Sequence, residues 1–488
     1  MTGVLAMMRA SLRIHLRSRL ALPMLLAVLA ADVALPLAIR GDGTLEGLIR
    51  LHLTYTLGLA SFLLGLFSLW AGCGGISREA ETRTLQLLVT KPVPRLSIWL
   101  GKWLALLVID AALLAVALAA SAATLHCRIQ SPAFTDADRA TTLPIALTSL
   151  TSLHPDLPDI SATVETDLGR LRAEGRLPDL PEKTIRAQLR HAALVRANTI
   201  HPGAEHLWTF TPPPHIPRDA PAWMQFHCDT SAFGVSETAI YCYPGSLVAA
   251  IARSLDISPT WQPTPIVTGI PALHPTPERL DAFADPRSGI FSLTVKNADP
   301  AHATLFFDPD DGIVLRVRTG TFAGNYLRAG LLLYGRLALL AAVGLALGTF
   351  FSTPVAAFAS VVLLLLLQLS GFIGGAAQAD RAVFVANVAP FGAHVHAGDA
   401  NAETEAAPPT PLARAAATAL YWLYRGTWAC IRPLMDDDAI DRLATATAIP
   451  AREVASSLLR RLLLLPLLLG LLSAAVLRSR EWALPAES

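Results

Sequence analysis

The chain has 488 residues, of which 53% are hydrophobic and only 16% are charged, whereas soluble domains carry about a quarter charged residues. This composition excludes a disordered chain and argues against an ordinary soluble enzyme. The 39 Lys and Arg residues nearly balance the 38 Asp and Glu residues, so the chain as a whole carries no nucleic-acid signature, and its five cysteines are too few for a disulfide scaffold.

Residues 1–19 predict an amphipathic helix that lies at the membrane surface. Val4, Met8, Leu12 and Leu16 recur every four residues, and Arg9, Arg13 and Arg17 accompany them. A basic amphipathic helix of this kind binds in the headgroup region of a bilayer. The alternative is a plain extension of the first membrane span. The segment lacks the long apolar core of a cleavable signal peptide, and none is expected.

Six segments are apolar enough, or nearly so, to cross a membrane as helices of about 20 residues. They are residues 20–39, 51–73, 98–122, 331–351, 354–373 and 462–477. The sixth segment is short and needs flanking residues to reach across. The fourth and fifth segments are joined by a short uncharged connection, which predicts a helical hairpin.

Basic residues beside the spans predict the orientation, because loops rich in Lys and Arg stay in the cytoplasm. They gather before the first span, between the second and third spans, and after the sixth: Arg9, Arg13, Arg17, Arg19, Arg78, Arg83, Lys91, Arg95, Arg478 and Arg480. With six spans, both termini are expected on the cytoplasmic side of a bacterial inner membrane. Residues 123–326 and 377–456 are then extracytoplasmic. Arg460 and Arg461, at the outer edge of the sixth span, are expected to extend toward the headgroups.

Residues 123–326 are numerous enough to fold as a separate domain. The first part, to about residue 200, has helical periodicity at 184–197, whereas residues 205–320 alternate β-forming side chains between turn residues. The pattern of residues 303–317 predicts a β-hairpin with a turn from Asp308 to Gly312. Several short strands at this spacing predict a β-sandwich.

The histidines and cysteines of this outside domain permit two interpretations. His201, His206 and His215 match no metal-ligand spacing, so solvated polar residues are favoured over a metal cluster and no metal or cofactor is expected. Cys228 and Cys242 lie on neighbouring predicted strands in a compartment where a disulfide persists, so the sequence allows a bond between them. Spacing along the chain cannot show whether the two Cα atoms approach closely enough.

Three charged residues fall within predicted spans: Asp32, Asp110 and Arg336. Such residues are costly in lipid and usually face a protein interior or a pathway. The favoured interpretation is an interhelical Asp–Arg pair that holds the helices together. The alternative is a polar lining on a substrate path.

The most informative stretch is the predicted cytoplasmic loop at 77–103, which is too long for a tight turn. Glu79 and Glu81 supply the acidic residues that favour a helix start, Leu85 and Leu88 share one face of a short helix, and Pro92 ends it. A short helix with one apolar face, held at both ends by membrane spans, suits the groove of a cytoplasmic partner.

This loop resembles that of ABC export permeases of the second class, the group that includes gliding-motility and nitrous-oxide-reductase-maturation permeases. The matching residues are Glu79, Glu81, Thr84, Leu85, Leu88, Pro92, Val93, Arg95, Gly101 and Lys102. Arg83 stands where the family usually has Gly, and Pro94 where it often has Ser. Segments 320–329, 352–356 and 432–438 are also similar to permeases with an inserted outside domain.

The resemblance implies a coupling helix, which docks on an ATPase subunit through Glu79, Glu81, Thr84, Leu85, Leu88, Pro92 and Arg95. It implies the membrane permease subunit of an ABC exporter, paired as a homodimer or heterodimer. No G-x-x-x-x-G-K-[ST] phosphate loop is present, so a separate subunit must hydrolyse ATP and the chain itself is not an enzyme. The alternative function is a non-transporting subunit that transmits force to its outside domain. A third function, a membrane enzyme or sensor, is not favoured, because the sequence contains no catalytic constellation.

The expected fold is a polytopic α-helical membrane protein with six transmembrane helices and an extracytoplasmic α+β domain that contains a β-sandwich. The outside domain lies between spans three and four. The expected segments are an amphipathic helix at 1–19, spans one to three at 20–122 with a coupling loop at 74–97, the outside domain at 123–326, spans four and five at 327–376, an outside loop at 377–456, and span six with the tail at 457–488.

Overall fold

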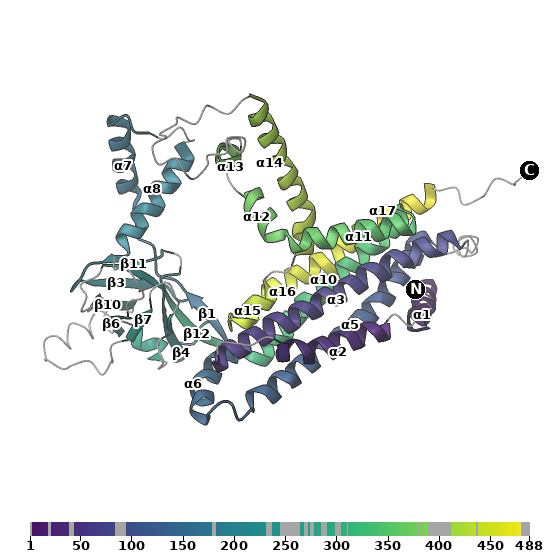
Figure 1. Ribbon diagram of the computed structural model, residues 1–488, viewed down its shortest axis with the longest axis horizontal. Helices are drawn as coiled ribbons and strands as arrows, with labels where there is room; N and C mark the ends of the chain where they lie inside the picture. The colour runs from purple at the N-terminus through teal and green to yellow at the C-terminus, as the bar shows by residue number, and fades with distance from the viewer. Residues whose placement is uncertain are drawn as a thin grey trace, which may run out of the picture. The chain divides into compact units, whose positions relative to one another are not determined.

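The computed structural model (Figure 1) describes most of the 488 residues, and the statements below concern the described residues alone. The residues outside the description are 1, 18–20, 39–42, 83–93, 178–181, 231–236, 245–263, 268–271, 274–277, 285–289, 298–303, 310, 379–380, 389–410, 436–437 and 480–488.

The chain forms two compact units, one made of Met1–Leu147 with Phe322–Ser488 and the other of Thr148–Thr321. The second unit is shorter than the outside domain expected at 123–326, because α5 runs to Ile129 and α6 packs on α3. The first unit is helical, with α1 (Thr2–Arg17), α2 (Ala21–Ala38), α3 (Leu45–Glu81), α5 (Arg95–Ile129), α6 (Asp136–Ala146), α10 (Phe322–Phe350), α11 (Thr353–Gln368), α12 (Ser370–Gln378), α13 (Arg381–Val388), α14 (Pro411–Ile431), α15 (Ala439–Ala444), α16 (Ala451–Leu458), a π-helix (Leu459–Leu464) and α17 (Leu465–Ser479).

Four helical stretches in the described part of the chain are long and apolar enough to span a membrane. They are α3, α5, α10 and the continuous stretch Ala451–Ser479, which joins α16, the π-helix and α17. α1 and α2, bent by 63°, make a fifth candidate if they count as one broken span. A polytopic helical protein is therefore supported, whereas the expected count of six spans is not confirmed.

The fifth predicted span and the loop after it differ from expectation. α11 has 16 residues, and the chain bends into α12 rather than continuing straight. The segment expected as a loop at 377–456 contains the amphipathic helix α14, which packs on α12 through Ile373, Trp428 and Ile431. Arg414 and Arg425 interrupt the apolar residues of α14, so its sequence does not predict a membrane span.

The sixth predicted span gains its missing length from α16 and the π-helix, which extend it to 29 residues. Arg461 lies in the π-helix and is buried at 4% exposure, where its guanidinium donates to the carbonyl oxygens of Pro433 and Met435. The expectation that Arg461 extends toward the headgroups is therefore wrong, because backbone carbonyl oxygens after α14 accept hydrogen bonds from its guanidinium. Arg460 is exposed and donates to Ser456 on its own helix.

α3 and α10 pack side by side with their backbones in contact (Figure 1). Glycines make this approach possible: a Cβ on Gly72 would lie 2.8 Å from the carbonyl oxygen of Ala341. A Cβ on Gly344 or Gly348 would overlap the carbonyl oxygen of Leu69 or Cys73. Small residues at such a crossing are typical of helices that pack within membranes.

The described residues of the Thr148–Thr321 unit form three antiparallel sheets and two α-helices. One sheet has the order β1-β12-β4-β8 with β9 beside β4, the second β3-β10-β6-β7 and the third β2-β11-β5. The elements are β1 (Thr148–Leu153), α7 (Ser161–Ala173), α8 (Glu182–Ala197), β2 (Thr199–Ile200), β3 (Glu205–Phe210), β4 (Pro221–Phe226), β5 (Cys228–Thr230), β6 (Glu237–Pro244), β7 (Thr264–Val267), β8 (Ala272–Leu273), β9 (Glu278–Arg279), β10 (Phe291–Asn297), β11 (Leu305–Phe307) and β12 (Ile313–Thr321).

One buried core joins the three sheets, and Trp208, Phe226, Leu293 and Phe307 are among its members. The strands at 205–210, 221–226 and 291–297 and the helix at 182–197 agree with the sequence pattern. A two-sheet sandwich, however, is not confirmed.

The predicted hairpin at 303–317 is wrong in its pairing, although both strands exist. β11 pairs with β2 and β5, whereas β12 pairs with β1 and β4. The turn forms, with the amide of Gly312 donating to the carbonyl of Asp308 at 2.9 Å. The chain changes sheets at this turn because apolar side chains of both strands, including Phe307 and Ile313, enter the shared core.

Candidate functional site

The structure describes both ends of the predicted coupling loop. α3 continues to Glu81 and α5 begins at Arg95, which is the first helical residue after Pro94. The predicted contact residues between them lie outside the described residues: Thr84, Leu85, Leu88 and Pro92. The described part of the site consists of the helix ends on either side of this segment.

Glu79 lies in the last turn of α3, not at a helix start as the sequence pattern indicated. A carboxylate near a helix C-terminus is unfavourable with respect to the helix dipole, so it needs a compensating cation. Lys102 on α5 supplies one: its Nζ lies 2.5 Å from Glu79 Oε1 and donates to the carbonyl oxygen of Gly75 at 2.8 Å. The Lys102 side chain is only 4% exposed, so the ion pair joins α3 to α5 in a largely dry environment.

Glu81 joins the same end of α3 to the start of α11. Its Oε1 accepts from the backbone amide of Thr353 at 2.9 Å, where the free amides and the dipole of a helix N-terminus favour an anion. The Thr353 hydroxyl donates to Ser77 Oγ, also at 2.9 Å. Ser77 and Glu81 border a cavity of about 350 Å³ between α3 and the α10–α11 connection. We call Ser77, Glu79, Glu81, Lys102 and Thr353 the joint.

α1 packs against α5 next to the joint. Gly101, next to Lys102, lets α1 approach α5 so closely that a Cβ there would lie 2.5 Å from the Cβ of Met7. Three residues of the predicted apolar stripe of α1, Val4, Met8 and Leu12, are partly buried, whereas the fourth, Leu16, is 63% exposed. Leu12 packs against the core shared by α3, α5 and α10. α1 therefore contacts the bundle as well as presenting its exposed arginines elsewhere.

The sequence contains a signal for the joint in the charges at the ends of two apolar segments. Lys102 is a lone lysine near the start of one apolar segment, and Glu79 follows the preceding one. Opposite charges at neighbouring ends of two spans predict a pair. No sequence pattern predicted the contact between Ser77 and Thr353, because the two residues are 276 positions apart.

The three intramembrane charges are not brought together as an Asp–Arg pair within the described residues. Asp110 is fully buried on α5 and accepts from the Ser68 hydroxyl at 2.9 Å. Asp32 on α2 is 1% exposed, and neither of its carboxylate oxygens has a hydrogen-bond partner among the described residues. A charge at the centre of a spanning helix costs about 2.5–3.5 kcal/mol on insertion scales, so such a residue usually faces the interior of the protein, as both aspartates do here.

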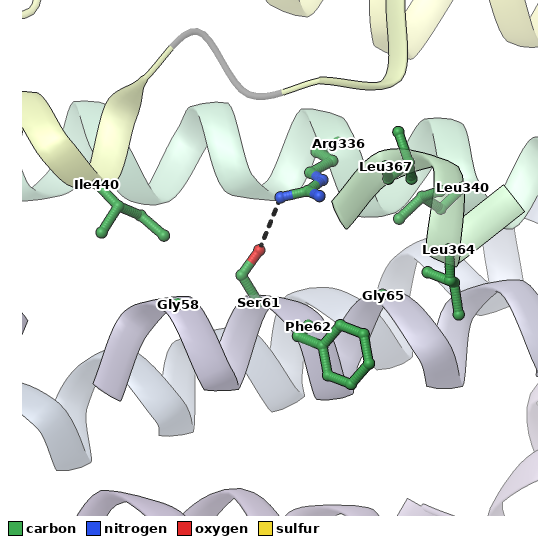
Figure 2. Close-up of a pocket in the computed structure, with 9 residues that line it drawn as sticks. All are labelled: Gly58, Ser61, Phe62, Gly65, Arg336, Leu340, Leu364, Leu367 and Ile440. Carbon is green, nitrogen blue, oxygen red and sulfur yellow. Dashed lines mark hydrogen bonds between the residues drawn. The ribbon is translucent and has the colours of Figure 1, made fainter. Parts of the chain in front are cut away.

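Arg336 instead lines a pocket of about 180 Å³ whose described lining comes from α3, α10, α11 and α15 (Figure 2). Its Nη1 donates to Ser61 Oγ of α3 across 3.3 Å, a long hydrogen bond. The expectation that Arg336 pairs with Asp32 or Asp110 is therefore not met in the structure.

Cys228 carries a free thiol in the structure, so the disulfide with Cys242 that the sequence allowed is not formed. Cys228 is on β5 and Cys242 is on β6, and these strands belong to different sheets. Cys228 is 1% exposed and belongs to the shared core of the unit. Burial, aided by the negative charge of Asp229, raises the pKa of the Cys228 thiol to about 12.

We expect Cys228 to resist iodoacetamide in the native protein at pH 8. At a pH far below its pKa a thiol forms little of the reactive thiolate, and burial keeps the reagent away. Exposed Cys127 should react under the same conditions and serves as the internal control. Peptide mapping before and after unfolding measures both sites. A Cys228–Cys242 peptide in a non-reduced digest would contradict the assignment.

The β unit also holds a cavity of about 620 Å³ that the sequence did not indicate. Its wall includes Pro212, Pro213, Phe210 and Ile216, with Asp156 at the edge. The Asp156 carboxylate accepts from the Thr211 hydroxyl at 2.9 Å. Among the described residues, no three His, Cys, Asp or Glu side chains form a group that could hold a metal ion.

A comparison with protein families finds a similarity over the residues that carry the α3 and α5 sides of the joint. Residues 5–154 match the family described as ABC-2 family transporter protein. The match begins in α1, includes α2, α3, α5 and α6, and ends just after β1. No curated protein and no solved structure gave a match.

The four candidate spanning helices support a multi-pass membrane protein, and residues 5–154, about a third of the chain, are similar to the ABC-2 transporter family. The matched residues include Glu79, Glu81, Gly101 and Lys102, and so they cover the α3 and α5 sides of the joint. The resemblance to ABC export permeases is supported at this level, without distinguishing the gliding-motility or nitrous-oxide-reductase class.

Proposed function

We propose that the chain is the membrane-spanning permease subunit of an ABC-type exporter. A separate ATPase subunit hydrolyses ATP, and this chain couples that hydrolysis to transport across the membrane. The match of residues 5–154 to the ABC-2 family supports the proposal, as does the absence from the sequence of a phosphate loop that would bind ATP.

The observation that carries the proposal is the joint at the two ends of residues 82–94. The Lys102–Glu79 ion pair connects the start of α5 to the end of α3. The hydrogen bond from the Thr353 amide to Glu81 connects the same end of α3 to α11. A partner that pushes on the 82–94 segment therefore moves α3, α5 and α11 together. A rigid lever of this kind is what an ATPase needs to change the arrangement of the spans.

In the proposed assembly, two permease subunits, identical or different, pair in the bacterial inner membrane, with the 82–94 segment and both termini in the cytoplasm. The basic residues Arg78, Arg83, Lys91 and Arg95 around this segment support that orientation.

A non-transporting function in mechanical transmission is the second candidate, and one observation favours it. β12 ends at Thr321 and α10 begins at Phe322, so no linker separates a strand of the β unit from a spanning helix. Motion of α10 would reach β12 directly. Substrate-stimulated ATP hydrolysis supports export, whereas ATP hydrolysis that responds only to a partner of the β unit supports transmission.

We expect the double variant Leu85→Ser, Leu88→Ser to insert normally and to lose co-purification with its ATPase by at least tenfold. These leucines are the predicted apolar anchors of the coupling helix, and buried apolar anchors carry most of the binding energy at an interface. Pull-down of the co-expressed ATPase and its stimulated activity are the measurements.

The matched control is Leu157→Ser, Leu177→Ser, which removes two exposed leucines from the β unit. This control should bind the ATPase as the parent protein does. Unchanged binding by the Leu85, Leu88 variant would refute the coupling assignment.

A further inference from the structure

The cavity of about 620 Å³ in the β unit has the size and the lining of a small-molecule site. Four of its lining residues also belong to the buried core of the unit and give it an apolar floor: Phe210, Ile216, Leu280 and Phe291. An apolar cavity of about 150 Å³ holds a benzene ring. The cavity therefore has room for a ligand several times larger than one ring.

The wall formed by residues 211–220 is held in one position by backbone contacts. Three consecutive prolines in it fix their own φ angles. The amide of Ile216 closes a turn by donating to the carbonyl of Pro213 at 3.1 Å, and the amide of Asp281 donates to the carbonyl of Arg218 at 2.7 Å. A wall fixed in this way forms the cavity before a ligand arrives, and a preformed site loses less entropy on binding.

One lining residue, Arg218, is an exposed cation at the rim of this cavity. Its guanidinium makes no hydrogen bond or ion pair with the described residues. Asp281, whose backbone contacts that of Arg218, has its carboxylate on Arg279 instead, at 2.6 Å. A guanidinium binds a carboxylate through two parallel N–H donors, so Arg218 offers a site for such a group on a ligand.

A second lining residue, Asp156, supplies an oriented anion at the same cavity. Its amide donates to the carbonyl of Thr209 at 2.8 Å, and its Oδ2 accepts from the Thr211 hydroxyl at 2.9 Å. Asp156 and Arg218 do not pair with each other in the described structure. The matching ligand therefore carries an ammonium and a carboxylate that are separated by an apolar body.

We propose that this cavity binds a short apolar peptide. Its terminal carboxylate lies on Arg218, its terminal ammonium lies on Asp156, and its side chains contact Phe210, Ile216 and Leu280. The cavity lies within the β unit, so this binding does not depend on the proposed coupling to an ATPase.

The test is equilibrium binding of radiolabelled leucine peptides of two, three and four residues to the purified full chain in a neutral maltoside detergent. At least one length should bind saturably. For that peptide, C-terminal amidation and N-terminal acetylation should each weaken binding about tenfold or more, because each removes one charge-assisted contact.

Three results overturn the proposal. They are the absence of saturable binding by all three lengths, equal binding of either capped peptide and the free peptide, and displacement of the peptide by equimolar lysophosphatidylethanolamine. The last result indicates a site for a zwitterionic lipid instead.

Two exposed residues locate the site by charge selectivity, which a merely structural role would not change. Arg218→Gln should bind the free peptide and its amide with equal, weakened affinity, and Asp156→Asn should lose the preference for the free over the acetylated peptide. The control Arg318→Gln changes an exposed arginine of β12 outside the cavity and should keep both preferences. If either cavity variant keeps the preference of the parent protein, the contact assigned to that residue is wrong and the proposal fails.

Discussion

Replacing Lys102 with methionine should lower the free energy of unfolding by about 3 kcal/mol, the lower end of what is lost when one partner of a buried ion pair is removed. Lys102 is 3% exposed, and the variant leaves the Glu79 carboxylate without this cation in the last turn of α3. The carbonyl of Gly75 loses its donor as well. The lower end of the range applies because the Glu79 side chain keeps 21% exposure.

A thermal melt of the purified protein in detergent measures this loss. The double variant Lys102→Met, Glu79→Gln should recover part of it, because the second change removes the buried charge that the first left behind. Arg452→Met, which removes an exposed cation from α16, is the control and should melt as the parent does. If Lys102→Met alone also melts as the parent does, the pair does not hold α3 to α5.

The double variant Gly344→Ala, Gly348→Ala should abolish most of the folded protein, and Gly348→Ala alone should cost about 2 kcal/mol. The added Cβ would overlap the carbonyl oxygen of Cys73, and backbone of a packed helix cannot move aside as a side chain can. Overpacking of this kind costs up to about 3 kcal/mol. The gain of about 1 kcal/mol in helix propensity from Gly to Ala reduces the net loss.

Gly58→Ala on α3 is the matched control, because the same substitution there meets no atom within 4 Å. It should leave stability unchanged or raise it slightly through helix propensity. Yield of monodisperse protein and its melting temperature measure all three variants. Equal melting of Gly348→Ala and Gly58→Ala would contradict the close crossing of α3 and α10.

Some of the differences between sequence and structure come from contacts that follow no local pattern. The hairpin at 303–317 was wrong because β11 and β12 joined different sheets around one core, which local alternation cannot distinguish from a simple pair. The helix start assigned to Glu79 and Glu81 was wrong because α3 tolerates acidic residues in its last turn. Lys102 and the amide of Thr353 offset them, and both lie far away in sequence.

The sequence by itself determined the apolar helices, since spans such as α3, α5 and α10 depend on local runs of apolar residues that no tertiary partner needs to supply. It also indicated the segment at 77–103 and the residues Arg336 and Asp110 as sites of interest. Only the tertiary structure decided what these residues contact: Lys102 for Glu79, Ser68 for Asp110 and Ser61 for Arg336. The physical reason is that a buried charge takes whichever polar group the packing of helices places within reach. For Arg336 that packing is the crossing of α3 and α10, which depends on glycine contacts between residues about 270 positions apart.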